Sequence, residues 1–109
     1  MKKNDIKILA DIKQGSENAF IELYNQNYPQ VERLILKNSG TIDDAKDIFQ
    51  DTIHVLLVKI RSDNFELSAS INTYIYGISK NLWLKRLRDV SRSKEIKLDN
   101  LLTLNDFYE

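Results

Sequence analysis

The chain has 109 residues, of which 42% are hydrophobic and 29% charged, and this length suits one domain. Its 16 basic and 16 acidic side chains give zero net charge, which excludes DNA binding driven by overall positive charge. Without cysteine there is no disulfide framework or thiolate metal site, and no apolar run is long enough to span a bilayer, so we expect a soluble, cytoplasmic protein.

Two helices are expected in the N-terminal part. The first runs from Asp5 to Gln14 with Gly15 as its stop, and Ser16 caps a longer second helix. Pro29 interrupts the second pattern, which predicts either a kink near Tyr28 or two abutting helices. The apolar positions of this segment are Ala19, Phe20, Leu23, Tyr24, Val31, Leu34 and Ile35.

A third helix follows the turn at 38–40, with Thr41 as its N-cap and acids in its first turn. Apolar residues recur at steps of three and four, which predicts one buried face: Ala45, Ile48, Phe49, Ile53, Leu56, Leu57 and Ile60. The opposite face carries Asp43, Asp47, Gln50, His54 and Arg61, with Asp51 beside them. That face could meet a partner, or it could simply be solvated.

The segment SDNFELSAS, residues 62–70, has no periodicity and one large aromatic, Phe65, among small polar residues. It is expected to be a loop between two long helices, and it is longer than such connections usually are. Phe65 could either tuck into the core or take part in contacts made by the loop.

The fourth helix is expected from Ser70 to about Arg88, and the segment Ser91 to Lys94 is interpreted as its exit. Its apolar arc leaves a narrow strip of Thr73, Gly77, Lys80, Asn81, Leu84 and Arg88, which suits a nucleic-acid backbone. Tyr76 and Trp83 are expected in the core, and the role of Tyr74 is left open. Seven Lys or Arg against two acids make residues 80–97 locally basic, a pattern that a solvated helix end would also show.

Three segments carry a resemblance: AFIELYNQNYPQV (19–31), DDAKDIFQDT (43–52) and SINTYIYGISKNL (70–82). In this order and spacing they resemble region 2 of bacterial sigma factors, most closely the extracytoplasmic-function (ECF) group. The resemblance covers about residues 15–88. It implies an all-α, compact bundle of about four helices, which we place at residues 1–90, with residues 91–109 as a partly ordered tail that begins an interdomain linker.

The resemblance also implies partners. The third helix would dock on the clamp helices of the largest subunit of core RNA polymerase through Asp43, Asp47, Gln50, Asp51 and His54. The following loop and the fourth helix would recognise and melt the minus-ten promoter element, mainly through the unwound non-template strand. The DNA-binding residues would be Asp63, Asn64, Phe65, Ser68, Ser70, Thr73, Lys80, Asn81, Lys85, Arg86 and Arg88. An anti-sigma factor is a further possible partner.

Members of this family continue into a second helical domain that reads the minus-thirty-five element, so we expect this chain to be a fragment of a longer protein. The alternative hypothesis is a sigma-like helical adaptor that binds proteins without reading DNA. A stand-alone binder of duplex DNA is disfavoured, because no helix-turn-helix pair is evident. We expect no enzymatic activity, no cofactor and no metal, because the sequence has no nucleophile motif or phosphate loop and His54 is the single histidine.

Overall fold

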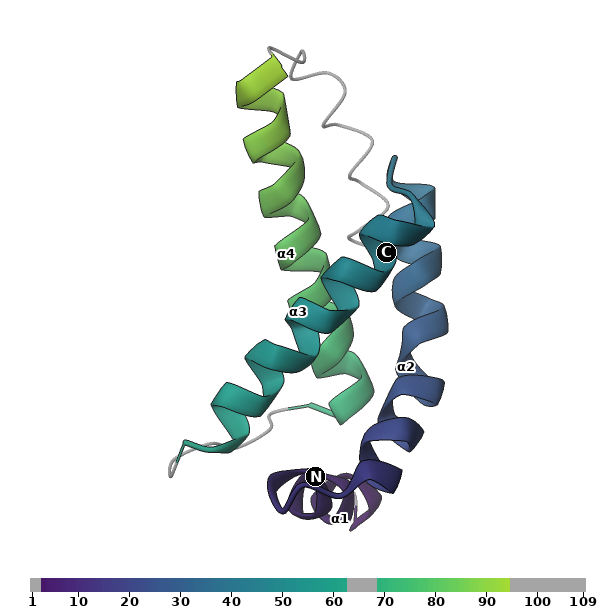
Figure 1. The fold of residues 1–109 in the computed structure, drawn as a ribbon, viewed down its shortest axis with the longest axis vertical. Helices are drawn as coiled ribbons and strands as arrows, with labels where there is room; N and C mark the ends of the chain where they lie inside the picture. The colour runs from purple at the N-terminus through teal and green to yellow at the C-terminus, as the bar shows by residue number, and fades with distance from the viewer. Residues whose placement is uncertain (1–2, 63–68, 95–109) are drawn as a thin grey trace.

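Four helices make up the described part of the chain. The computed structural model describes residues 3–62 and 69–94, which contain α1 (Lys3–Lys13), α2 (Glu17–Lys37), α3 (Ile42–Ile60) and α4 (Ile71–Lys94). Helices α2, α3 and α4 contact one another along their lengths, and α1 lies across one end of them (Figure 1). The prediction of an all-α bundle of about four helices is confirmed. The expected tail beyond residue 94 and most of the expected loop, residues 63–68, lie outside the described residues.

The helix boundaries at two turns are those that the sequence predicts. Gly15 has a φ of 85°, the left-handed conformation that ends a helix, and the hydroxyl of Ser16 accepts a hydrogen bond from the Ala19 amide at 3.2 Å. At the start of α3 the Thr41 hydroxyl accepts from the Asp44 amide, and the Asp44 carboxylate accepts from the Thr41 amide. This capping box satisfies two amides that the helix cannot bond internally.

The structure decides two expectations about helix ends. Of the two outcomes expected at Pro29, a kink or two abutting helices, the second is excluded, because α2 is continuous from Glu17 to Lys37. The fourth helix does not end near Arg88 but continues to Lys94. Residues 88–94 contain neither Gly nor Pro, and cations in the last turn of a helix are favoured by its dipole, so the supposed exit segment is compatible with helix.

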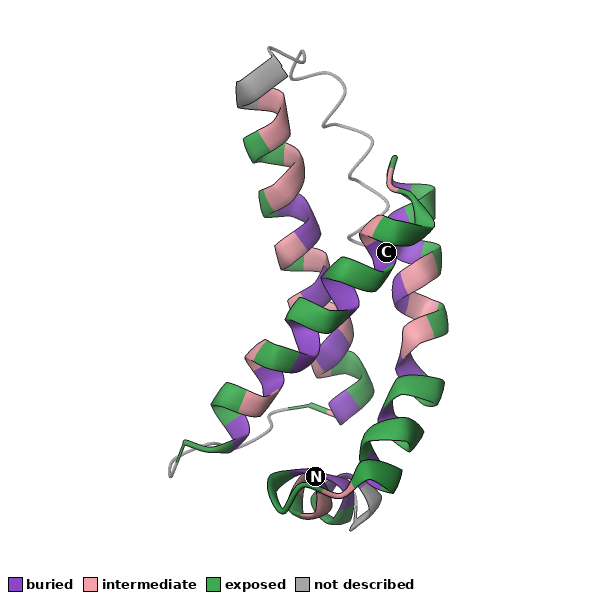
Figure 2. Cartoon of the chain, in the orientation of Figure 1, coloured by how far each residue is buried: buried purple, intermediate pink, exposed green. Residues whose placement is uncertain are grey.

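The core lies where the three long helices face one another, as the buried residues in Figure 2 show. Its largest fully buried members are Leu23, Val31, Ile35, Ile48, Phe49, Leu56, Ile71 and Ile75. Trp83 of α4 is 3% exposed, which confirms its predicted place in the core, while Tyr76 is half-buried against it. The indole N–H of Trp83 donates to the backbone oxygen of Asn38 at 3.0 Å, so α4 is attached to the turn between α2 and α3.

Two buried hydroxyl groups join α3 to α4. The Oγ1 of Thr52 and the Oγ of Ser79 lie 2.8 Å apart, and both residues are fully buried. Each hydroxyl also lies within donating distance of a carbonyl of its own helix, Thr52 of Ile48 at 2.7 Å and Ser79 of Ile75 at 2.9 Å. Each carries one hydrogen, so two of the three hydrogen bonds form at a time, and both hydroxyls always have a partner, as burial away from water requires.

Asp5 attaches α1 to the beginning of α4. Its side chain is buried, and its Oδ2 accepts a hydrogen bond from the Ile71 backbone amide at 3.1 Å, across 66 positions of sequence. A carboxylate at the N-terminal end of a helix is favoured both by the free amides there and by the helix dipole. Asp5 therefore caps α4 from a different helix.

Replacing Asp5 tests this cap. We expect Asp5→Ala to lower the free energy of unfolding by about 1–3 kcal/mol, because it leaves the buried Ile71 amide without an acceptor. Asp5→Asn keeps an acceptor oxygen and should cost less. Urea unfolding followed by circular dichroism measures both, with Asp11→Ala on the same helix as control. Equal losses for the Ala and Asn variants of Asp5 would contradict the capping role.

Candidate protein and nucleic-acid interfaces

The acidic side of α3 is open to solvent. All five side chains predicted to dock a protein partner are exposed: Asp43, Asp47, Gln50, Asp51 and His54. Asp43 and Asp47 stand one turn apart, and no described ion pair engages either of them. The capping box at Thr41 and the buried apolar face of α3 hold the helix that presents them.

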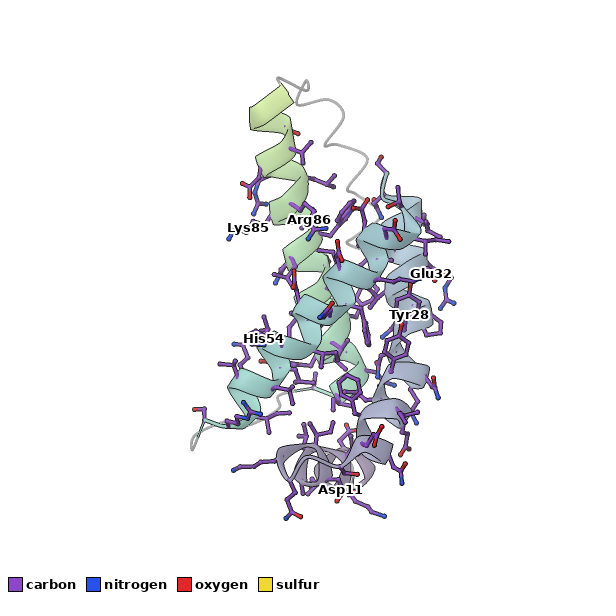
Figure 3. All side chains as sticks on the ribbon, in the orientation of Figure 1. Asp11, Tyr28, Glu32, His54, Lys85 and Arg86 are labelled. Atoms are coloured by element: carbon purple, nitrogen blue, oxygen red, sulfur yellow. The ribbon has the colours of Figure 1, made fainter. Side chains whose placement is uncertain are left out.

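A groove between α2 and α3 adjoins this acidic side. Its volume is about 690 Å³, and it is lined by Phe20, Tyr24, Lys46, Phe49, Gln50, Asp51, Ile53, His54 and Leu57. Three of these belong to the predicted docking set, which therefore borders an apolar channel. His54 can be located on α3 in Figure 3.

The sequence analysis counted Phe20 and Tyr24 among the apolar positions of the second helix, and the structure places neither of them in the core. They are 39% and 37% exposed and form one wall of the groove. Aromatic rings that remain partly exposed beside polar side chains are typical of protein interfaces. Their position at the edge of the apolar arc of α2, rather than at its centre, was the available signal.

Tyr24, Tyr28 and Phe49 form a compact aromatic cluster under this groove. The Tyr24 and Tyr28 rings stack with centroids 5.0 Å apart, and each meets Phe49 edge-on, at 4.9 Å and 5.5 Å. Burial raises the pKa of Tyr28 to about 12, and the nearby Glu32 carboxylate adds to the rise. The enclosed hydroxyl makes no direct hydrogen bond within the described residues. Tyr28 therefore stays protonated and neutral throughout the physiological range.

The polar strip predicted on α4 is only partly as expected. Thr73, Asn81 and Arg88 are exposed and Lys80 is half-buried, but Leu84 is 8% exposed and belongs to the core. Including Leu84 in the strip was wrong, because the apolar surfaces of α2 and α3 enclose more of α4 than a single arc. Lys85 is exposed and is seen on the side of α4 in Figure 3.

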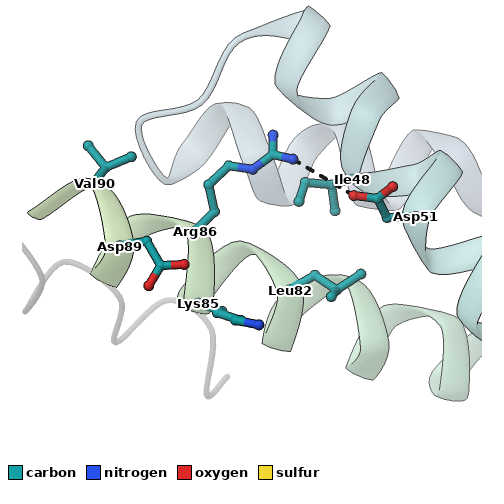
Figure 4. Close-up of a pocket in the computed structure, with 7 residues that line it drawn as sticks. All are labelled: Ile48, Asp51, Leu82, Lys85, Arg86, Asp89 and Val90. Atoms are coloured by element: carbon teal, nitrogen blue, oxygen red, sulfur yellow. Dashed lines mark ion pairs between the residues drawn. The ribbon is translucent and has the colours of Figure 1, made fainter. Parts of the chain in front are cut away.

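Arg86 of α4 faces two carboxylates of α3. Its guanidinium lies 3.8 Å from Asp51, as Figure 4 shows, and 3.8 Å from Asp44. The side chains are between 34% and 60% exposed, so the pairs contribute little to stability. They nevertheless direct Arg86 toward α3. They also give Asp51 a partner within the chain, whereas none of the described ion pairs involves Asp47.

The start of α4 makes its own hydrogen bonds. The Ser70 hydroxyl accepts from the Thr73 amide at 3.2 Å and donates to the Thr73 hydroxyl at 2.9 Å. Ser70, a predicted DNA-binding residue, thus acts as the N-cap of α4, and Thr73, a second one, is its partner in the first turn, an arrangement the sequence analysis did not anticipate. The predicted loop residues Asp63, Asn64, Phe65 and Ser68 lie outside the described residues.

Two adjoining grooves follow the seam between α3 and α4, with Leu82 in the lining of both. One, of about 380 Å³, is lined by Ile48, Asp51, Leu82, Lys85, Arg86, Asp89 and Val90 (Figure 4). The other, of about 500 Å³, is lined by Val55, Lys59, Ala69, Thr73, Tyr74, Gly77, Ile78, Asn81 and Leu82. Four exposed polar residues of α4, Thr73, Asn81, Lys85 and Asp89, therefore border grooves that both helices form.

Comparison with known proteins agrees with this geometry. A family model described as Sigma-70 region 2 matches residues 23–93, which leaves α1 outside the match. The ECF RNA polymerase sigma factor SigW of Bacillus subtilis (strain 168) is 27% identical over 82 residues, covering 75% of this chain and 43% of that protein. The chain thus spans less than half the length of this curated relative. No solved structure matches the chain. None of the helices in the described part has the length and hydropathy needed to cross a membrane.

Proposed function

The chain belongs to the sigma-70 region 2 family, and from that premise we propose that it docks on core RNA polymerase through α3 and opens the minus-ten promoter element through α4 and the loop before it. The observation that supports this best is that one bundle carries two distinct surfaces. An acidic face with an aromatic groove lies on α3 and α2, and a polar strip with basic residues lies on α4.

The polymerase surface would consist of Asp43, Asp47, Gln50, Asp51 and His54, extended by Phe20 and Tyr24. Carboxylates there would pair with cations on the clamp helices and fix the orientation of docking. The exposed aromatic rings would supply apolar contact that charge alone does not give. Because Asp51 already pairs with Arg86, Asp43 and Asp47 would contribute more to docking.

The DNA surface would act without bond chemistry. A base that leaves the stack is held by hydrogen bonds to its edge and by stacking, so binding to the unpaired strand shifts the equilibrium toward the open form. Lys80, Lys85 and Arg88 would contact phosphates, whereas Asn81 and the loop residues Asp63, Asn64, Phe65 and Ser68 would read bases. Ser70 and Thr73 would act mainly by fixing the start of α4, and Arg86 by linking α4 to α3.

Selection of single-stranded DNA tests this function. The protein is incubated with oligonucleotides carrying a randomised minus-ten-like core at two salt concentrations, and bound strands are sequenced. We expect a short enriched motif with the wild-type chain and its loss with Asn81→Ala, because a good bidentate contact supplies about 1–3 kcal/mol of discrimination. Asn25→Ala, an exposed position on α2, is the matched control.

The adaptor hypothesis remains the second candidate, and the groove with Phe20 and Tyr24 supports it as much as it supports the first, because any protein partner could use an aromatic channel. If core polymerase is retained in a pull-down while no motif is enriched and no single strand is bound, the adaptor is the better description. Loss of the motif in both Asn81→Ala and Asn25→Ala would reflect damage to the fold rather than to a contact.

A further inference from the structure

Gly77 occupies an unfavourable position for a glycine. It lies in the second turn of the 24-residue helix α4, inside the helix, where Gly is less stable than Ala by about 0.5–1 kcal/mol. A Cβ atom built on Gly77 would meet no atom of the described residues within 4 Å, in contrast to Gly40, where it would lie 2.8 Å from the Trp83 ring. Packing among the described residues therefore explains Gly40 and does not explain Gly77. A glycine with room for a side chain is expected where another molecule approaches the helix backbone closely.

The space beside Gly77 is the groove of about 500 Å³ between α3 and α4. Its apolar lining is half-buried and comes from both helices: Val55 on α3, and Tyr74, Ile78 and Leu82 on α4. Exposed polar side chains stand on both edges, Thr73 and Asn81 on α4 and Lys59 on α3. An apolar floor with an aromatic ring suits a base, and a cation and an amide at the edges suit a phosphate and a base edge.

We propose that this groove holds a segment of the unpaired DNA strand, with the backbone at Gly77 as the point of close approach and Lys59 as a phosphate contact. The proposal rests on the proposed function and adds to it a residue of α3, the helix otherwise assigned to polymerase. From this groove the strand would continue past Leu82 toward Lys85. The eight-residue step from Gly77 to Lys85 rises about 12 Å along α4.

Substitutions at Gly77 give effects of opposite sign on stability and on binding. Gly77→Ala should raise the melting temperature by about 2–8 °C, because alanine favours the helix and its methyl group would meet no atom in the described part of the chain. It should nevertheless weaken binding to a fluorescently labelled mixed-sequence single strand of about 12 nucleotides. Gly77→Gln, which extends into the groove, should weaken binding by about 5- to 150-fold, the equivalent of losing the stacking of one base.

Lys59 has a matched control on its own helix. Lys59→Gln and Lys46→Gln change the net charge equally, but Lys46 lines the groove between α2 and α3. Only Lys59→Gln should reduce the slope of log affinity against log salt concentration, by about 0.7 for one lost phosphate contact on a single strand. Fluorescence anisotropy over a salt series measures both slopes.

The outcomes separate this inference from the proposed function. If the wild-type chain binds single strands but Gly77→Gln leaves the affinity unchanged and the two lysine variants behave alike, the groove proposal is overturned and the function stands. If the wild-type chain binds no single strand, the function fails and the groove proposal with it. Asn25→Ala on α2 controls for a general effect of helix stabilisation, and it should not weaken binding.

Discussion

Trp83→Ala is expected to lower the free energy of unfolding by about 3–5 kcal/mol, a large part of the roughly 5–15 kcal/mol available to a domain of this size. The side chain is 3% exposed, and its indole N–H donates to the Asn38 carbonyl. Its ring also lies directly over Gly40. Removing it would leave a cavity between α4 and the α2–α3 turn and a buried carbonyl without its donor.

The measurement is urea unfolding followed by circular dichroism, since Trp83 is the single tryptophan and its fluorescence is lost in the variant. Trp83→Phe retains much of the ring and should cost less. Gly40→Ala should cost about 1–3 kcal/mol by overpacking against the same ring and Ile35. The smaller ring of Phe at position 83 should partly relieve the alanine at 40, so the two losses should not add. Additive losses, or a Trp83→Ala midpoint close to wild type, would contradict this description.

The second large effect concerns polymerase binding. Reversing two charges on the open face of α3, Asp43→Lys with Asp47→Lys, is expected to weaken binding to core polymerase on the order of 100-fold or more. Like charges brought together at an interface cost several kcal/mol, and each 1.4 kcal/mol is about tenfold in affinity. Both residues are exposed, so the fold should be retained.

A matched control uses acids elsewhere on the molecule. Asp11→Lys with Glu22→Lys makes the same change in net charge on residues that line a groove between α1 and α2. Binding is measured by titrating labelled domain with core polymerase at fixed salt. If both double variants lose affinity equally, the effect is one of net charge, and α3 is not the docking surface.

The sequence predicts the helix ends best where the signal is local. The caps at Ser16 and Thr41 and the stop at Gly15 depend on residues within one turn, and the structure confirms all three. Two other local signals did not end a helix. Pro29 lies inside α2, which continues past it, and the segment after Arg88, which has no helix breaker, continues α4.

The site could be predicted less completely, because the side of a helix that is buried depends on the helices packed against it. Periodicity on one helix cannot say how wide an arc its neighbours cover. The exposure of Phe20 was therefore not foreseen, and Leu84 was wrongly assigned to the polar strip. The pairing of Arg86 with Asp51 joins helices that are separate in sequence, and no spacing rule indicates it. The same is true of Asp5, whose partner lies 66 positions away.

The buried hydroxyl pair at Thr52 and Ser79 has a consequence for how α3 and α4 are aligned. Two helices that meet only through apolar side chains can shift lengthwise against each other, because one aliphatic contact replaces another. A slip of one turn, about 5.4 Å, would separate these two hydroxyls and leave each with only the carbonyl of its own helix as partner. The pair therefore selects a single longitudinal register, and that register brings Lys59 and Val55 of one helix level with Gly77 and Asn81 of the other.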